Sequence, residues 1–96
     1  MRPAPHRLHV VAAERAHYRI TFEQAGDVTF CHCEVDHWSP EVKRQMVADL
    51  DTLCSLRRSP LFVWMEPENE KLSRFCHSVG FVDAGDIGAY RLMRRV

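Results

Sequence analysis

The segment CHCEVDH, residues 31–37, holds the side chains best suited to chemistry. Glu34, Asp36 and His37 come at the carboxyl end of an expected strand, Val28–Asp36. Open α/β sheets commonly bind ligands at the carboxyl ends of their strands. A carboxylate or an imidazole at such a place can take a proton from an amine, directly or through water. The ordinary pKa of histidine suits His37 to that task. The competing interpretation is a solvated strand end that carries no chemistry.

The same segment contains two cysteines separated by one residue. Cys31 and Cys33 are two residues apart, so with His37 they would share one face of a strand. Structural zinc takes four ligands, commonly from close cysteine pairs, and the sequence has no second pair of that kind. Cys54 and Cys76 lie in expected helices, whose packing needs them as small apolar side chains. We therefore predict no metal site, and a zinc-stabilised binding domain stays as a minor alternative.

Length and composition predict one small domain. The chain has 96 residues and is expected to form a single domain over 1–96, with residues 1–6 flexible. Lys+Arg and Asp+Glu both number 13, and this balance argues against a nucleic-acid partner. No apolar run is long enough to cross a membrane or to form the core of a signal peptide. We expect a cytoplasmic location, in the cell's own or a virus-infected cytoplasm or in a virion, with the cysteines as thiols.

The first half of the chain has the two-residue period of strands. Leu8–Ala12 predicts a short strand, and apolar residues alternate with polar ones from Tyr18 to Glu23. The turn residues QAGD at 24–27 precede a second strand-like run, Val28–Asp36. These features predict a β-hairpin.

The period then changes to that of a helix. Ser39 suits the N-cap, Pro40 the first helical position and Glu41 the positive end of the helix dipole, while Arg57 and Arg58 suit the other end. The apolar residues at helical spacing are Val42, Met46, Val47, Leu50, Leu53 and Cys54.

The second half predicts a strand, a helix and a hairpin. Residues 60–65, PLFVWM, are apolar on both faces, as in an interior strand covered by helices. A helix follows with Leu72, Phe75, Cys76 and Val79 at helical spacing, and Gly80 suits its left-handed cap. Strands near Phe81–Asp83 and Ala89–Arg94 are expected, joined by AGDIG.

The order of elements sets the predicted fold class. The helix that begins after Ser39 would join Val28–Asp36 to Leu61–Met65 as parallel strands, and the other pairings would be antiparallel. We predict an α/β (α+β) fold with a mixed, mainly antiparallel sheet, one β-α-β crossover and two helices.

The stretch NEKLSRFCHSVGF carries a family likeness. Asn69, Gly80 and Phe81 stand in the register of the last helix of the GCN5-related N-acetyltransferases (GNATs). VTFCHCEVD with the helix after Ser39 is similar to that family's central strand and cofactor-facing helix. PLFVWMEPEN resembles the strand that diverges from its parallel neighbour to admit acyl-coenzyme A. The likeness covers about residues 17–95 and is nearest to abbreviated GNAT-like proteins of phages.

This resemblance implies a ligand and roles for particular residues. The ligand would be acetyl-coenzyme A or another acyl-coenzyme A, running between the end of Val28–Asp36 and the strand that leads to Glu66. The acceptor would be an amine on a small molecule or a protein, with Glu34 or His37 as the base. Cys76 falls where the family often has the tyrosine that protonates the leaving thiolate. The residues expected to contact the cofactor are Cys33, Val35, Ser39 and Asn69.

Some of these residues also have a purely structural interpretation. Cys76 also belongs to the apolar stripe of its helix, which favours a buried core thiol, and Asn69 suits a helix cap. The family's glycine-rich phosphate loop is missing where HWSPEVKRQ stands. There Pro40 removes an N–H donor and Glu41 adds negative charge. The alternative function is therefore a non-catalytic GNAT-like interaction module or phage structural protein, acting as a homodimer or with a protein partner.

Overall fold

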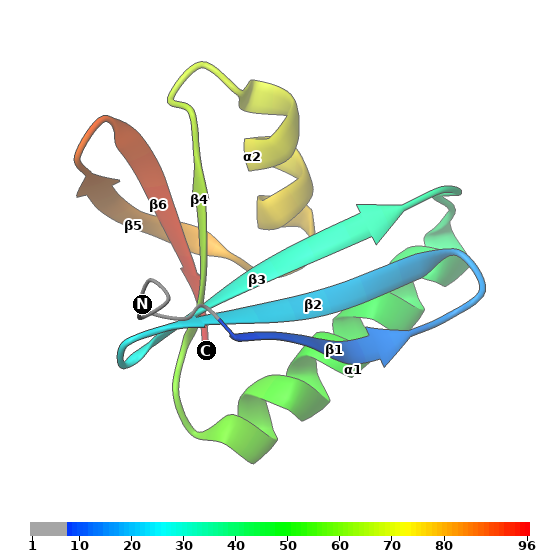
Figure 1. The fold of residues 1–96 in the computed structure, drawn as a ribbon. Helices are drawn as coiled ribbons and strands as arrows, with labels where there is room; N and C mark the ends of the chain where they lie inside the picture. The colour runs from blue at the N-terminus through cyan, green and yellow to red at the C-terminus, as the bar shows by residue number, and fades with distance from the viewer. Residues whose placement is uncertain (1–7) are drawn as a thin grey trace, which may run out of the picture.

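A computed structural model describes residues 8–96, so the expectation for residues 1–6 lies outside the described part of the chain. Its six strands form one sheet in the order β1-β2-β3-β4-β6-β5, accompanied by two helices (Figure 1). The elements are β1 Leu8–Glu14, β2 Tyr18–Ala25, β3 Val28–Val35, α1 Pro40–Arg57, β4 Leu61–Met65, α2 Glu70–Ser78, β5 Val82–Ile87 and β6 Tyr90–Arg95.

The sheet is mixed, as predicted. β3 and β4 run parallel on either side of the α1 crossover, and every other neighbouring pair is antiparallel. The expected fold class is confirmed, since the order of elements and the parallel pair are those the sequence indicates. The β2–β3 hairpin turns at Gly26, which has a positive φ of 61°, within the expected QAGD segment.

Helix α1 begins and packs as its sequence dictates. The Ser39 side chain accepts a hydrogen bond of 3.1 Å from the backbone N–H of Val42, and Pro40 is the first helical residue. The stripe that α1 buries against the sheet is Val42, Met46, Leu50 and Cys54. Within residues 8–96, no helix is both long enough and apolar enough to span a membrane.

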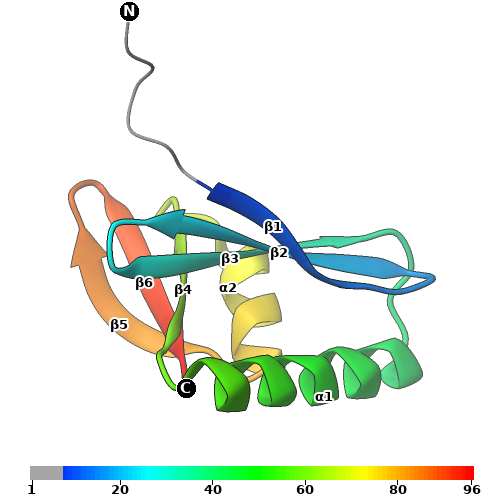
Figure 2. The same cartoon turned by 60° about the horizontal axis from the view of Figure 1, so that its bottom comes forward.

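Both helices pack on one face of the sheet (Figure 2). The sheet contributes alternate residues to this core, among them Ile20, Cys31, Leu61 and Met93. On the other face no described helix covers the sheet, and Trp64 there is 38% exposed. The expectation that residues 60–65 would be covered on both faces is therefore wrong. Both crossovers return on the same side, so β4 is interior to the sheet yet covered on one face only.

The corner after α2 is confirmed as a left-handed glycine cap. Gly80 has a φ of 105°, and its N–H donates to the His77 carbonyl at 3.2 Å. The N–H of Phe81 donates to the Cys76 carbonyl at 2.9 Å, which completes a Schellman motif. Phe81 is thereby folded back into the core beside Cys76.

The last hairpin turns later than predicted. β5 extends to Ile87 and the turn falls at Gly88, which has a φ of 58°, so residues 84–87 of AGDIG are strand and only its last glycine belongs to the connection. The register shifts between Asp83 and Asp86, and Gly85 between them has a φ of 93°. This irregularity lets β5 take up an extra residue and continue pairing with β6.

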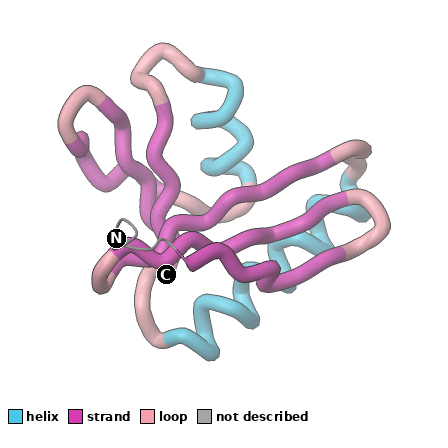
Figure 3. The backbone as a smooth tube through the Cα atoms, viewed as in Figure 1, coloured by secondary structure: helices cyan, strands magenta, loops and turns pink. Residues whose placement is uncertain are grey.

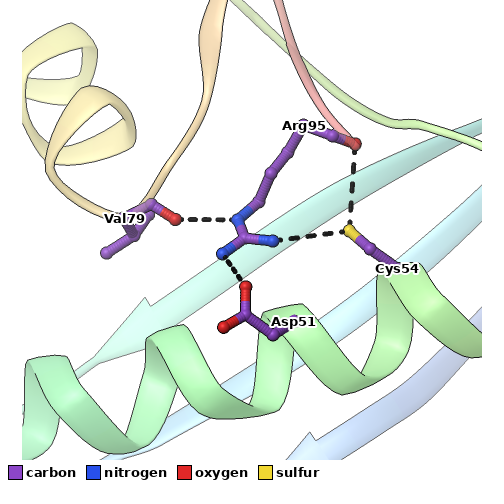
Figure 4. A network of polar contacts seen from close by, with 4 residues as sticks. All are labelled: Asp51, Cys54, Val79 and Arg95. Carbon is purple, nitrogen blue, oxygen red and sulfur yellow. Dashed lines mark hydrogen bonds and ion pairs between the residues drawn. The ribbon is translucent and has the colours of Figure 1, made fainter.

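Arg95, at the end of β6, ties the two helices to the sheet (Figure 4). Its side chain is 6% exposed and donates from Nε to the Val79 carbonyl at 2.8 Å. Another guanidinium nitrogen donates to Asp51 Oδ1 of α1 at 2.6 Å, and Cys54 Sγ lies 3.7 Å from the third. A buried guanidinium is retained only where such partners replace water.

A second polar cluster fastens α1 to the β1–β2 turn. Arg15 donates to both carboxylate oxygens of Asp49 at 2.9 and 2.7 Å, and the Tyr18 hydroxyl donates to the same carboxylate. The hydrogen bonds from Arg15 hold the pKa of Asp49 below its ordinary value. Burial, assisted by the hydrogen bond to Asp49, raises the pKa of Tyr18 to about 12.

We predict that Gly80→Ala destabilises the fold more than Gly85→Ala. A side chain at a positive φ costs about 1–2 kcal/mol at either position. At Gly80 the added methyl would also lie 2.8 Å from Arg95 Nε, whereas nothing lies within 4 Å at Gly85. Urea denaturation of the two variants measures the difference. Equal losses of unfolding free energy would show that Arg95 yields freely and is not the rigid tie described above.

We predict that Asp49→Asn removes stability that depends on pH. Because the pKa of Asp49 is lowered by folding, its contribution is complete above the unfolded pKa of about 4 and is lost as the pH falls through the folded value. The gap in unfolding free energy between the wild type and Asp49→Asn should be full at pH 7 and close below about pH 4. Asp27→Asn, in the exposed β2–β3 turn, is the control. A difference in unfolding free energy that stays constant with pH would contradict the role given to the Asp49 carboxylate.

Candidate functional site

The site begins where β3 and β4 separate. The two strands pair only through Thr29 with Leu61 and Phe30 with Phe62. Beyond this point they diverge, with α2 at the open end of the angle (Figures 1 and 3). Their outer edges remain paired, β3 with β2 and β4 with β6. The facing inner edges of residues 31–35 and 63–65 therefore have no strand partner within the described chain.

A pocket with a volume of about 860 Å³ occupies the divergence. Its walls are the second half of β3 with the loop to α1, two residues of β4, the first turns of α2, and Phe81. Trp38 packs edge-on against Phe75 with ring centroids 5.1 Å apart, and this pair closes one wall. An opening of this size with mainly apolar walls and a few polar groups is typical of a small-molecule site.

The pocket collects nearly all the residues that the sequence analysis singled out. The predicted residues that line it are Cys33, Glu34, Val35, His37, Asn69 and Cys76. Ser39 is not in the lining, and its hydroxyl caps α1. Asn69 lines the pocket while its side chain also caps α2, accepting from the Leu72 N–H at 3.1 Å. Both interpretations of Asn69 are therefore compatible with its position.

Sequence reasoning missed several residues of the lining. Lys71 brings a positive charge to the wall from the first turn of α2, and Trp64 lines the pocket from β4. Leu72 and Phe75, identified in the sequence as helix core, are only partly buried and line the pocket as well. No local pattern signalled Lys71, because its place in the lining depends on how α2 is oriented toward the gap.

The pocket is lined from both faces of the sheet. Cys31, Cys33 and Val35 alternate toward the helices, whereas His32 and Glu34 alternate toward the uncovered face. Side chains from both faces of the sheet can therefore be reached from the gap between β3 and β4. A ligand lying among the thiols and a second molecule approaching the Glu34 side would meet at this gap.

Glu34, Val35 and Asp36 also border a second, smaller hollow of about 360 Å³. Its other side is the β1–β2 turn, where His17 Nδ1 lies 3.3 Å from Asp36 Oδ1 and the His17 ring packs against that of His37 at 5.0 Å. Arg19 lies 3.8 Å from Glu34. The polar groups proposed for proton transfer therefore stand at an exposed rim where the two hollows meet.

The thiols inside the pocket differ in their acidity. Cys31 and Cys33 have their sulfurs 4.0 Å apart. A hydrogen bond from the Cys31 thiol lowers the pKa of Cys33, and the same bond together with burial raises the pKa of Cys31. Burial raises the pKa of Cys76 to about 12. At neutral pH Cys76 and Cys31 are thus held as thiols, and Cys33 ionises most readily of the three.

No metal centre is formed by the side chains of residues 8–96. No cluster of three or more histidine, cysteine, aspartate or glutamate side chains there has an arrangement that could hold an ion. Cys54, which a zinc site would need as a further ligand, instead lies against the buried guanidinium of Arg95.

Comparison with solved structures finds a match over most of the chain. The structure superimposes on a ribosomal-protein-S5-alanine acetyltransferase from Vibrio fischeri with a TM-score of 0.61 and 14% identity, over 83% of this chain. The fold is GNAT-like. The match covers 54% of the Vibrio fischeri chain, so the present chain spans about half of that protein's length. No family model matches the sequence, and no curated protein matches it. The comparison gives no support to a phage origin.

We predict that Ser39→Ala and Asn69→Ala each destabilise the fold by about 1 kcal/mol, because both remove an N-cap acceptor. The two caps make bonds of the same length, 3.1 Å, to the third residue of their helices. Thermal unfolding of both variants measures the losses. A neutral result for Asn69→Ala alone would mean that its side chain is not engaged as a cap and is free for a ligand.

Proposed function

We propose that the protein is an acyl-coenzyme A-dependent N-acyltransferase that passes an acetyl or other acyl group to an amine. The observation that carries this proposal is the pocket at the divergence of β3 and β4, in a GNAT-like fold. The amine belongs to a small molecule or a protein, and the Vibrio fischeri structure is named for an acetyltransferase of a ribosomal protein. We place the reaction in the cytoplasm.

The unpaired strand edges suit the amide-bearing arm of coenzyme A. Extended ligands with amide groups bind exposed strand edges through main-chain hydrogen bonds. Val63 of β4 and Val35 of β3 stand beside these edges, and Trp38 and Phe75 supply apolar contact. The residues present therefore fit the thioester arm of the ligand.

The phosphate groups need a different explanation, because the glycine-rich loop of the family is replaced here by HWSPE. Lys71 is the lysine in the pocket lining, and it stands beside Asn69 in the first turn of α2, which also carries Glu70. We assign the phosphate contact to Lys71. The first turn of α1 is less suitable, since Pro40 lacks an N–H donor and none of residues 40–43 is in the pocket lining.

Positioning supplies most of the catalysis in this proposal. A thioester lying on the Cys33 side and an amine entering on the Glu34 side would be brought together at the gap. Glu34 or His37, both exposed at the rim, takes the proton of the attacking amine, directly or through water. Cys76, with a pKa near 12, remains protonated and can donate to the departing sulfur only as a weak acid.

Calorimetric titration with acetyl-coenzyme A tests the proposal. We predict binding to the wild type, and a loss of affinity of about tenfold or more in Lys71→Ala, since a charge-assisted contact to phosphate is worth about 1.5–3 kcal/mol. Ser39→Ala, which removes a cap outside the pocket lining, should bind as the wild type does.

No heat from the wild type at millimolar acetyl-coenzyme A would overturn the acyltransferase proposal. Equal affinities of the wild type and Lys71→Ala would overturn the assignment of the phosphate contact to Lys71, but the pocket would remain the proposed binding site. Raising the salt concentration provides an independent control, because only a phosphate contact should weaken strongly with salt.

The uncovered sheet face favours a second candidate function, a non-catalytic module that binds a second copy of the chain. Trp64 and Tyr90 pack edge-on there with centroids 4.8 Å apart, and Val82 of β5 is exposed as well. Exposed apolar patches of this kind often mark interaction sites. Sedimentation velocity tests it. The module requires a dimer in the wild type that dissociates in Trp64→Glu, and a wild type that is monomeric at every concentration would contradict it.

A further inference from the structure

Three of the four cysteines of the chain line the pocket, namely Cys31, Cys33 and Cys76. Cys31 and Cys76 are each only 2% exposed, whereas Cys33 is partly exposed to the pocket. A reagent that enters the pocket therefore meets the sulfur of Cys33 before the other two. The fourth cysteine, Cys54, is buried against Arg95 away from the lining.

The arrangement of Cys31 behind Cys33 follows from the strand. Residues two apart on a strand share a face, and here both side chains come from the helix-facing side of β3. Their sulfurs lie 4.0 Å apart, which is within hydrogen-bonding distance for sulfur. Either sulfur can donate in this pair, and when the more accessible Cys33 is ionised the buried Cys31 thiol is the donor. A thiolate on Cys33 would keep that hydrogen bond, and the thiolate is the nucleophilic form of cysteine.

The surroundings of Cys33 suit an electrophile better than a metal ion. No metal-holding cluster is formed by the described side chains. The walls are mainly apolar and aromatic, and the strand edges beside Cys33 are unpaired. An acyl thioester matches this environment, because its carbonyl carbon is attacked by thiolates in an exchange that needs no redox partner.

We propose that Cys33 is an acyl-acceptor site, which takes the acyl group of a thioester bound in the pocket to form S-acyl-Cys33. This inference rests on the proposed function. The Cys33 proton leaves to solvent, and Cys33 Sγ then forms a bond to the carbonyl carbon. The bond from that carbon to the donor sulfur breaks, and the donor leaves as a thiolate that takes a proton from water. The acyl group then resides on the chain, at the gap that an amine on the Glu34 side can reach.

Intact-mass measurement of the full chain after incubation with acetyl-coenzyme A tests the proposal, followed by peptide mapping without thiol reductant. We expect one acetyl group, located on Cys33 and removed by neutral hydroxylamine, as a thioester is. Cys33→Ser should lack this adduct, and Cys54→Ser, which alters a thiol outside the pocket lining, should retain it. Acetylation of another cysteine or of Lys71 in place of Cys33 would overturn the proposal.

The role of Cys31 provides a second readout. Cys31→Ala should acquire the adduct about two- to tenfold more slowly, the factor that one net hydrogen bond supports. Cys31→Ser keeps a donor at the same place and should restore most of the rate. Identical rates in all three proteins would show that Cys31 does not support the Cys33 thiolate and would overturn the paired arrangement argued here.

Two acyl donors, acetyl-coenzyme A and a short thioester, distinguish a failure of the Cys33 proposal from a failure of the proposed function. Calorimetry on Cys33→Ser shows whether acetyl-coenzyme A binds, independently of any adduct. Binding without an adduct in the wild type overturns the Cys33 proposal and leaves the proposed function intact. An adduct on Cys33 from the short thioester S-acetyl-N-acetylcysteamine, with no binding of acetyl-coenzyme A, supports the Cys33 proposal and overturns coenzyme A as the donor. No adduct from either thioester overturns the Cys33 proposal.

Discussion

The two residue pairs that join β3 to β4 are the constraint on which the rest of the structure depends. They divide one sheet into two fully paired parts, β1-β2-β3 and β4-β6-β5, which touch at one end and separate at the other. Had the parallel pairing run the full length of β4, the inner edges would be satisfied by each other and the pocket would be closed. The pocket exists because these edges are not paired with each other.

So short a pairing requires that the two parts be held together by other contacts. The shared core beneath the sheet contributes, since Met46 and Leu50 of α1 belong to one buried cluster with residues of both parts, such as Ile20 and Met93. Arg95 adds a polar tie at the joined end, where β6, α1 and the end of α2 meet. Gly80 is required at that point because a side chain there would collide with the Arg95 guanidinium. These contacts thus hold the two parts together at the joined end, while the other end stays open.

Local sequence rules predicted the elements, and they failed where tertiary context decides. The cap at Ser39, the stripe of α1 and the corner at Gly80 depend on nearest neighbours along the chain, so the sequence specifies them. The apolar residues Phe62 and Trp64 indicated a covered strand, but whether a helix lies over a face depends on the side to which each crossover returns. Gly85 looked like a turn, and only its pairing with β6 shows that it sits in an irregular strand. Lys71 became a site residue because α2 is oriented toward the gap, which no local pattern reports.

We propose that a thioester binds in the gap between β3 and β4. Backbone amide chemical shifts, followed by NMR during a titration with acetyl-coenzyme A, test this most directly because they report on every strand at once. The account predicts that the largest changes fall on residues 31–36 and 63–65, at the unpaired inner edges, and that β1 and β5 are nearly unaffected. Changes confined to the uncovered face or to β5, with the inner edges silent, would contradict it.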